Sequence, residues 1–598
     1  MIWTICFCLS VFVILSILCW ILVKSKTKNK DGRIKSFNPL NYLMAGVFLA
    51  GLIIFIPVYF DFFEETASPV FRIVKTALLS IHNTIRLFII DSDFEMIRES
   101  TANLEGFIYH AYPVYTALIY VTAPILTFGF ILSFFKNVIS YAKYVFAYRK
   151  DVYVFSYLND YSVALATDIA KNHKKALIVF TDIYKFDDDK EHKLFEQINA
   201  IGAISFKKDI THINWGFHSK NSEIYFFILN EVEGENIKIF SQLNELYKTR
   251  DNTEIYLFSR TAQGDLVLSN AVDSKIKVRK INYAQSLIYR TLYERGEEIF
   301  RSARPIPDSN KKMISAVVIG LGNYGSTLVK ALTWFCQMDG YEIKINAFDE
   351  DEKAESKFSS SCPELMDKRY NGVSVEGESE YSIIIHSGID YTTKEFDEKI
   401  KAIKDATFVF ISSGSDASNI SCAVKVRTLF ERYNLSPVIN TVVYDSEQKA
   451  YIERATNPRG QEYKINCIGD IKTTYSEKVI IDSELEQDAL SRHLKYGKEE
   501  DFWRYDYNYR SSTASAIHMK ARILLGIKGA DKKEDELTEE DISTIELLEH
   551  KRWNAYMRSE GFVHGEKRND LAKVHHNLVF FDQLSDEDKL KDRKVGSK

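Results

Sequence analysis

The sequence contains few cysteines, and none has the spacing of a metal site. Seven cysteines occur in 598 residues, without a CxxC or CxH pair. Three lie in the first apolar run and four are far apart in the rest of the chain: Cys6, Cys8, Cys19, Cys336, Cys362, Cys422 and Cys467. This pattern favours buried free thiols in a reducing compartment over a disulfide framework or a zinc site.

An excess of positive charge is also missing. The chain has 77 Lys and Arg against 82 Asp and Glu, a net charge of −5 at pH 7. Proteins that bind nucleic acid usually present a strongly basic face, so this balance gives no support to a nucleic-acid partner. Proline is scarce, with 10 residues, and aromatic residues make up 13% of the chain. This composition argues against long disordered tracts.

Long apolar runs, in contrast, are present. Three segments are apolar over about the 20 residues that a bilayer requires, namely residues 2–23, 41–60 and 111–135. The first run is followed, not preceded, by a basic stretch at residues 24–35, which is the reverse of a cleaved signal peptide. Because basic loops tend to stay in the cytoplasm, we expect a multi-pass inner-membrane protein in contact with lipid. Its N-terminus would be outside and residues 151–598 cytoplasmic.

The segment between the second and third runs has a helical pattern of its own. Apolar residues recur at helical spacing from Ile73 to Phe88, and Lys75, His82 and Arg86 interrupt them. The pattern predicts either a re-entrant, pore-lining helix or an amphipathic helix on the outer membrane surface. The sequence has no TVGYG-like selectivity filter, so a potassium-selective pore is not supported.

A glycine turn stands out in the remaining chain. The stretch AVVIGLGNYGSTLVKAL, residues 316–332, is a buried-strand pattern that breaks into glycines and then into a helix. In such a turn Gly320 permits the tight bend, Gly322 lets the backbone approach a pyrophosphate, and Gly325 allows close packing of helix on strand. The turn therefore predicts a nucleotide site. The alternative is that the fold is retained without a ligand.

Residues around the turn complete the candidate cofactor site. Asn323 and Tyr324 begin the helix, whose unpaired N–H groups favour phosphate. Asp349 ends the next strand, about 30 residues after the first glycine, where its carboxylate could accept hydrogen bonds from an adenosine ribose. Three more candidates follow a later strand and face the same crevice: Ser412, Ser413 and Gly414.

The pattern of residues 151–300 indicates a degenerate copy of the domain that contains the glycine turn. Strand and helix patterns alternate again, but Ser156 and Leu158 stand where the second copy has glycines. The Leu158 side chain would block close approach of a pyrophosphate to the backbone. We therefore interpret this domain as mainly structural, with Asn159 and Asp160 as an altered ligand turn in the alternative case.

Paired glycine-turn domains behind a membrane segment resemble the NAD-binding regulatory domains of Trk-type potassium-uptake and potassium-conductance-regulator proteins. The similarity covers roughly residues 151–480. It implies a module that senses NAD or a related adenine nucleotide and gates a membrane pore. No catalytic His, Lys or Tyr partner is apparent beside the turn, which disfavours a dehydrogenase. The membrane part departs from that family because it lacks the pore motif.

The C-terminal region turns helical and resembles the ryanodine-receptor repeat domain. The matching residues are Glu549-His550, Arg552-Trp553-Asn554, Gly561, Lys573 to Leu578, Phe581 to Leu584 and Lys591 to Arg593. The resemblance implies an α-helical module that binds a small nucleotide-like signal. Its candidate ligand contacts are two aromatic residues for stacking and three cations for phosphate: Trp553, Tyr556, Arg552, Lys573 and Arg593.

A structural role for these residues is the alternative, because His550 and Trp553 are at helical spacing and can belong to the core. A metal site of His550, His564 and His575 is disfavoured, since no thiolate or carboxylate cluster accompanies the histidines.

Together these features predict a multi-domain chain. We expect a three-helix transmembrane region at residues 1–150, Rossmann-like α/β domains with parallel sheets at 151–300 and 312–480, and a ryanodine-repeat-like helical domain at 485–598. The expected function is a membrane-anchored, homo-oligomeric nucleotide sensor that permeabilises the membrane, in the context of bacterial antiphage defence. Alternatives are a potassium-transport regulator, a membrane-tethered NAD-dependent enzyme and a non-channel oligomeric scaffold.

Overall fold

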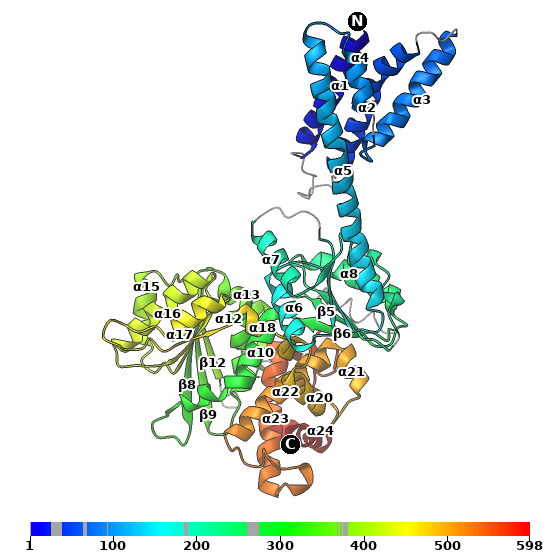
Figure 1. Ribbon diagram of the computed structural model, residues 1–598. Coiled ribbons are helices and arrows are strands. Elements are labelled where there is room, and N and C mark those ends of the chain that lie inside the picture. Colours follow the sequence, from blue (N-terminus) through cyan, green and yellow to red (C-terminus); the bar gives the residue numbers. More distant parts are fainter. Residues whose placement is uncertain are drawn as a thin grey trace. The chain divides into compact units, whose positions relative to one another are not determined.

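The structure is a computed structural model that describes residues 2–25, 39–63, 68–91, 94–183, 189–219, 221–259, 274–367, 369–370, 373–374 and 381–597. The chain divides into two compact units, Met1–Phe146 and Ala147–Lys598. Figure 1 labels helices and strands of both units.

The first unit is built from helices. They are α1 (Ile2–Ser25), α2 (Pro39–Phe62), α3 (Pro69–Leu87), α4 (Phe94–Thr101) and α5 (Phe107–Phe146). Three stretches are long and apolar enough to cross a membrane: Ile2–Leu22, Pro39–Phe62 and Phe107–Ile131. The prediction of three such helices is confirmed. Its sidedness stays a prediction, and most of the basic stretch at residues 24–35 lies outside the described residues.

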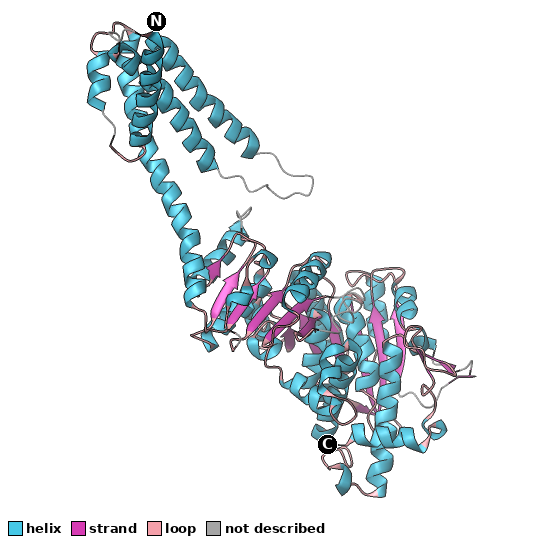
Figure 2. Ribbon diagram, turned by 90° about the vertical axis from the view of Figure 1, so that its right-hand side faces the viewer, coloured by secondary structure: helices cyan, strands magenta, loops and turns pink. Residues whose placement is uncertain are grey.

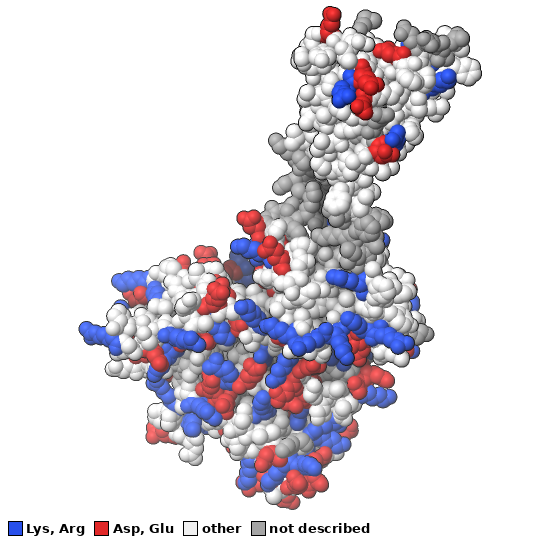
Figure 3. Space-filling view, in the orientation of Figure 1, with Lys and Arg blue, Asp and Glu red and all other residues white. Residues whose placement is uncertain are grey.

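Two hydroxyl groups of the first unit form hydrogen bonds between its helices. The Tyr112 hydroxyl on α5 donates to the Ile54 carbonyl on α2 at 2.6 Å, and the Ser10 hydroxyl on α1 donates to the Ala50 carbonyl at 3.0 Å. Such bonds tie the helices together where water is scarce. In Figure 3 the face of this unit carries few charged side chains.

Helix α3 is amphipathic, but its apolar side faces outward. Its buried side chains are mainly polar: Thr76, Ser80, Asn83 and Thr84, together with the apolar Leu87 near its end. Large apolar residues are exposed on it: Val70, Phe71, Ile73, Val74, Leu78, Ile81 and Ile85. A pore-lining helix and a surface helix both place an apolar face against lipid, so the two alternatives for this segment remain open.

The second unit begins with a parallel six-stranded sheet. Its strands are β1 (Val152–Phe155), β2 (Leu177–Phe180), β3 (Ile204–Ser205), β4 (Ile224–Ile228), β5 (Thr253–Phe258) and β6 (Lys277–Ile281). They lie in the order β3-β2-β1-β4-β5-β6. The connecting helices are α6 (Asp160–Asn172), α7 (Asp189–Ala200) and α8 (Glu233–Tyr247), and α10 (Tyr283–Arg295) leads onward.

A second parallel sheet follows. Its strands are β8 (Lys312–Ile319), β9 (Tyr341–Phe348), β12 (Tyr381–His386), β13 (Phe408–Ile411), β14 (Val438–Val442) and β15 (Ile465–Ile468), with β7 (Arg304–Pro305) antiparallel on β8. The parallel strands lie in the order β12-β9-β8-β13-β14-β15. Counted along each domain, both sheets have the order 3-2-1-4-5-6 of doubly wound folds. The prediction of α/β domains with parallel sheets is confirmed.

Helices alternate with the strands of the second sheet (Figure 2). They are α11 (Glu297–Arg301), α12 (Asn323–Phe335), α13 (Ala354–Ser361), α14 (Pro363–Asp367), α15 (Lys394–Ala402), α16 (Asp416–Glu431), α17 (Ser446–Glu453), α18 (Ile471–Thr474) and α19 (Glu477–Ile480). A short hairpin, β10 (Arg369–Tyr370) and β11 (Val373–Ser374), lies before β12.

The C-terminal region is mainly helical, as expected. It contains α20 (Glu484–His493), α21 (Glu499–Arg504), α22 (Asp506–Leu524), α23 (Glu539–Ser559) and α24 (Asp586–Gly596). A small parallel pair, β16 (Val563–His564) with β17 (Val574–His575), was not predicted. One hydrophobic core includes Trp334 of α12, Ile517 of α22 and Tyr556 of α23. The helical region therefore shares its core with the second sheet.

Candidate nucleotide site at the glycine turn

Two glycines of the turn are required by the fold itself. Gly320 has φ +87°, and a Cβ there would overlap the carbonyl oxygen of Ser412. A Cβ on Gly325 would overlap the carbonyl oxygen of Gly320. Gly320 therefore permits the bend and Gly325 lets α12 approach β8, which are the roles that the sequence predicts for them.

Gly322 is different, because the fold does not need a glycine there. Its φ is −61°, which any residue can adopt. Apart from Gly322 itself, its two chain neighbours and the backbone of α12, no atom of the described residues lies within 4 Å of the place where a Cβ would stand. Gly322 is exposed and is the N-cap residue of α12. The open space lies at a helix N-terminus, where backbone N–H groups and the helix dipole favour an anion.

Asp349 supports the turn directly. Its Oδ2 accepts from the Leu321 N–H at 2.5 Å, and its Oδ1 accepts from the Asp351 N–H at 2.8 Å. A carboxylate has about four acceptor positions. Asp349 therefore fixes the turn and retains acceptor capacity, and its contact with a ribose stays a prediction.

The second loop meets the turn, because the carboxyl ends of neighbouring parallel strands lie at the same edge of a sheet. The Ser412 hydroxyl donates to the Gly320 carbonyl at 3.2 Å, and the Ser413 N–H donates to Asn419 Oδ1 at 2.6 Å. Gly414 is exposed and has φ +129°. This loop and the turn line one edge of the sheet.

Sequence reasoning missed a cluster of tyrosines at the same edge. Its members, here called the tyrosine cluster, are Tyr161, Tyr283, Tyr324, Tyr444 and Tyr475. The ring centroids of Tyr283 and Tyr324 are 5.7 Å apart, those of Tyr324 and Tyr444 are 6.3 Å apart, and those of Tyr161 and Tyr475 are 4.6 Å apart. Asn323 Nδ2 donates to the Tyr283 hydroxyl at 3.5 Å. Each tyrosine lies shortly after a strand, which is the signal that could have revealed them.

Four of the five tyrosines, Tyr161, Tyr324, Tyr444 and Tyr475, have a raised pKa because they are buried. Burial, with Tyr444 and Glu231 as further causes, raises the pKa of Tyr161 to about 12. Burial, followed by the charge interaction and hydrogen bond with Tyr444, also raises the pKa of Tyr324. The hydroxyls of Tyr161 and Tyr324 therefore stay protonated at neutral pH.

In the first sheet, the turn between β1 and α6 is capped by the side chain of one of its own residues, Asn159. Asn159 is the N-cap of α6, where its Oδ1 accepts from the Ser162 N–H at 2.8 Å. Its Nδ2 donates to the Leu229 carbonyl at 2.7 Å. The helix N-terminus that would bind a phosphate is thus capped internally, which favours the structural interpretation of this domain.

Two of the five candidate residues in the C-terminal region are part of the interior. Arg552 is 1% exposed, and its Nη2 donates to Glu549 Oε1 at 2.7 Å. Tyr556 is fully buried, and its ring centroid lies 6.3 Å from that of Trp334. Neither side chain faces solvent, because both point from α23 into the shared core.

The other three candidates are engaged at separate places. The Trp553 ring packs edge-on against His575 at 4.9 Å, whereas Lys573 Nζ donates to the Glu560 carbonyl at 2.7 Å. Arg593 Nε donates to Glu546 Oε1 at 2.8 Å. The structure does not bring the five residues together into one site. Among the described residues, no group of three or more His, Cys, Asp or Glu could hold a metal ion.

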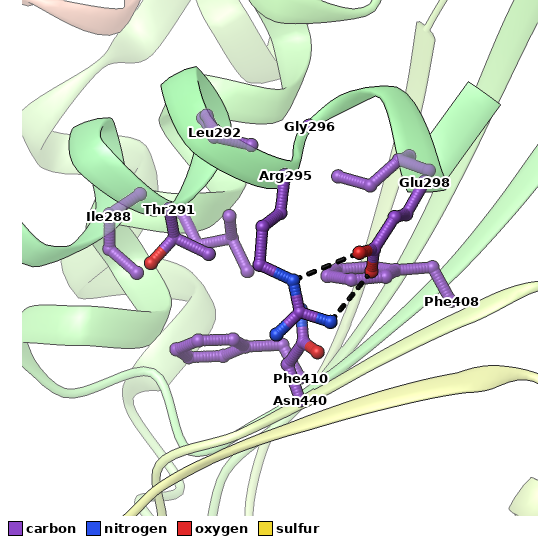
Figure 4. Close-up of a pocket in the computed structure, with 11 residues that line it drawn as sticks. Ile288, Thr291, Leu292, Arg295, Gly296, Glu298, Phe408, Phe410 and Asn440 are labelled. Carbon is purple, nitrogen blue, oxygen red and sulfur yellow. Dashed lines mark hydrogen bonds and ion pairs between the residues drawn. The ribbon is translucent and has the colours of Figure 1, made fainter. Parts of the chain in front are cut away.

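Several pockets among the described residues lie away from the turn, and two of them border α10. The first, between α10 and β13, has a volume of about 10 Å³, the space of one water, and the Arg295–Glu298 ion pair at 2.9 Å borders it (Figure 4). The second, of about 150 Å³, lies among α10, α20 and α22. The first is a packing gap, and the second contains cations and acids in near balance.

Comparisons with known proteins add no support to the two resemblances described in the sequence analysis, which depend on the sequence motifs alone. No protein-family model matches the chain, and no curated protein matches it. Among solved structures, a dipicolinate synthase subunit from Bacillus halodurans is similar over 56% of this chain and 95% of its own, with 9% sequence identity and a TM-score of 0.19. A similarity at this level carries no argument about function.

Proposed function

We propose that the protein is a membrane-anchored sensor of an adenine nucleotide, with NAD as the first candidate, and that the ligand binds at the Gly320–Gly325 turn. The observation that carries this proposal is the open space at Gly322. Glycine lowers chain stability relative to other residues unless its lack of a side chain is needed. The fold uses that lack at Gly320 and Gly325, whereas at Gly322 a phosphate at the N-terminus of α12 accounts for it.

The output is a change in the membrane region. The strand β1 starts six residues after the end of α5, so residues 147–151 form a short connector. This connector is fixed to the first α/β domain, since the Ser219 N–H donates to the Tyr148 carbonyl at 3.0 Å and the Glu223 N–H to Asp151 Oδ1 at 3.0 Å. A ligand that favours one arrangement of the α/β domains can thereby act on α5.

The proposal includes the sidedness and context expected from the sequence. The N-terminus is outside, residues 151–598 are cytoplasmic, and oligomers of the chain leak ions or solutes when the nucleotide binds. The resemblance to Trk-type regulatory domains supports the gating role, and the resemblance to ryanodine-receptor repeats supports a defence role. The helical region acts as a support for α12 in this proposal.

The test compares two glycine variants of the full-length protein in detergent. Gly322→Trp should leave the melting temperature unchanged but abolish stabilisation by NAD and ADP-ribose, because the indole fills the phosphate space. The matched control is Gly234→Trp, at an exposed glycine of α8 that also has no described atom within 4 Å of its Cβ position. At 100 times its dissociation constant, a ligand adds about 2.7 kcal/mol to stability.

Each outcome has a defined meaning. Stabilisation that is lost only in Gly322→Trp, together with nucleotide-dependent leakage from liposomes, supports the proposal. Stabilisation that survives in Gly322→Trp but is lost in Trp553→Ala moves the sensor to the C-terminal region. If neither nucleotide stabilises the wild-type protein, the non-channel scaffold is the better explanation.

A further inference from the structure

A hollow lined mainly by cations lies at the amino-terminal edge of the first sheet, where β1 and β2 begin. Its volume is about 580 Å³. Its charged lining, here called the basic hollow, consists of four cations and one acid: Arg149, Lys150, Lys174, Lys175 and Asp151. Nucleotide ligands of such sheets bind at the opposite edge, beyond the carboxyl ends of the strands. The basic hollow is therefore a separate feature from the glycine turn of the second sheet.

Two segments of the chain supply these cations. Arg149 and Lys150 belong to the connector between α5 and β1, whereas the other two lie in the loop between α6 and β2. Because β1 and β2 pair in parallel, with Val152 opposite Leu177, the two segments enter the sheet side by side. The Leu177 N–H donates to the Asp151 carbonyl at 2.9 Å. The sheet thus brings the two pairs of cations together.

The four cations have no paired acid in the part of the chain that the structure describes. All four residues are exposed, and none of their side chains forms a hydrogen bond or an ion pair there. The nearby acids are engaged elsewhere. Asp151 Oδ1 accepts from the Glu223 N–H at 3.0 Å. Glu477 accepts from Asn172 Nδ2 at 2.7 Å and also pairs with His173. The hollow therefore carries an excess of positive charge.

Several other exposed lysines of the same domain do have acid partners. The ion pairs are Lys190 with Asp160 at 2.6 Å, Lys248 with Glu245 at 2.8 Å and Lys275 with Asp251 at 2.9 Å. Each pair of cations in the basic hollow follows the C-terminus of a helix, α5 or α6, where positive charge is favoured. That effect does not require the two pairs to share one concave surface. A cleft lined by charges of one sign concentrates ions of the opposite sign.

We propose that the basic hollow binds an anion with two or more phosphate groups, which bridges the connector and the loop between α6 and β2. Phosphate oxygens form strong, charge-assisted hydrogen bonds with Lys and Arg. A single phosphate would satisfy only part of the lining, because the cations come as two pairs from two segments. The source is either a soluble polyphosphate or the headgroup of an anionic lipid, since basic segments after a membrane helix attract such lipids. This site does not depend on the proposed nucleotide site.

The experiment measures thermal stabilisation of the full-length protein in an uncharged detergent. The probes are tripolyphosphate and cardiolipin, whose headgroup carries two phosphates, with phosphatidylcholine as the lipid control. We expect the double variant Lys174→Gln, Lys175→Gln to weaken binding of the stabilising probe roughly tenfold or more. The double variant Arg149→Gln, Lys150→Gln should do the same. Lys174→Arg with Lys175→Arg should retain binding, because both charges are kept.

The matched control is the double variant Lys207→Gln, Lys208→Gln. These two lysines are also adjacent and exposed in the same domain, but they follow β3 at the carboxyl edge of the sheet. The control removes the same amount of charge and should leave binding unchanged. Added salt should weaken binding to the wild type, because interactions between exposed charges are screened.

Each outcome supports or overturns the inference. Stabilisation by tripolyphosphate that both double variants of the hollow lose identifies a soluble polyphosphate, and the same result with cardiolipin alone identifies a lipid headgroup. No stabilisation by either probe, or an equal loss in the control, overturns the inference. A loss in Gly322→Trp but not in the variants of the hollow would place the phosphates at the glycine turn and also overturn it. Failure of NAD to bind would contradict only the proposed function.

Discussion

At the residue scale, three glycines in one turn have three different surroundings. At Gly320 and Gly325 there is no room for a side chain, because backbone atoms of Ser412 and of Gly320, respectively, lie where a Cβ would stand. At Gly322 that space is open. A backbone atom cannot move aside to make room for an added Cβ, whereas the end of a flexible side chain can. The same residue type therefore serves the fold at two positions, and at the third we propose that it serves the ligand.

Substitution at Gly325 should damage the fold rather than ligand binding alone. We expect Gly325→Ala to lower the free energy of unfolding by roughly 1–3 kcal/mol, because the added methyl overlaps the Gly320 carbonyl and forces α12 away from β8. Gly322→Ala should lower it by less than about 1 kcal/mol. Thermal denaturation of both variants checks the difference, and equal losses would contradict this account of the turn.

At the element scale, α23 is held in place by buried charge. Arg522 of α22 and Arg552 of α23 both bind Glu549, at 2.9 and 2.7 Å. Arg492 of α20 is also buried, and its Nη1 donates to the Ser597 carbonyl at 2.7 Å. Burial alone would raise the pKa of Glu549, but Arg552 and Arg522 outweigh it and hold that pKa below its usual value. The negative charge of the Glu549 carboxylate thus offsets the positive charges of several buried guanidinium groups.

Removal of that carboxylate should be costly. We expect Glu549→Gln to destabilise the protein by roughly 3–5 kcal/mol, because buried arginines lose their counter-charge. The control Glu540→Gln, on an exposed part of the same helix where Glu540 pairs with Lys528, should change stability by less than about 1 kcal/mol. Denaturant titration measures both. A loss at Glu549 no larger than at Glu540 would show that the cluster is hydrated or otherwise compensated.

At the scale of the whole molecule, the proposed sensor requires that a change in the α/β domains reach the candidate membrane helices through the connector. Residues 147–151 join α5 directly to β1, and Tyr148 and Asp151 are bonded within the first α/β domain. Short, anchored connections transmit displacement, whereas flexible Gly/Ser segments do not. The proposed sensor depends on this connection.

An inserted flexible segment should separate binding from response. We expect a Gly-Ser-Gly-Ser insertion after Lys150 to leave NAD affinity unchanged and to abolish NAD-dependent leakage from liposomes. The same insertion after Asp308, in the exposed turn between β7 and β8, should retain both. A leakage response that survives the insertion after Lys150 would mean that the signal reaches the membrane by another route.

Much of this architecture was predictable from the sequence because it depends on local pattern. Apolar runs of sufficient length indicate the three candidate membrane helices, and alternating strand and helix patterns indicate two parallel sheets. The turn at Gly320 was recognisable because its glycines are close together in the chain. The small β16–β17 pair escaped prediction because its strands have only two residues each.

The sequence by itself thus determined the elements and the glycine turn, since contiguous hydrophobicity and local backbone geometry need no distant partner. Only the tertiary structure decided that Arg552 and Tyr556 point into a core, because their helical spacing is compatible with either face. It also decided that Tyr161 and Tyr475 lie side by side, although more than 300 residues separate them. Such convergence follows from the packing of α18, after the second sheet, against α6 of the first α/β domain, which no short sequence window contains.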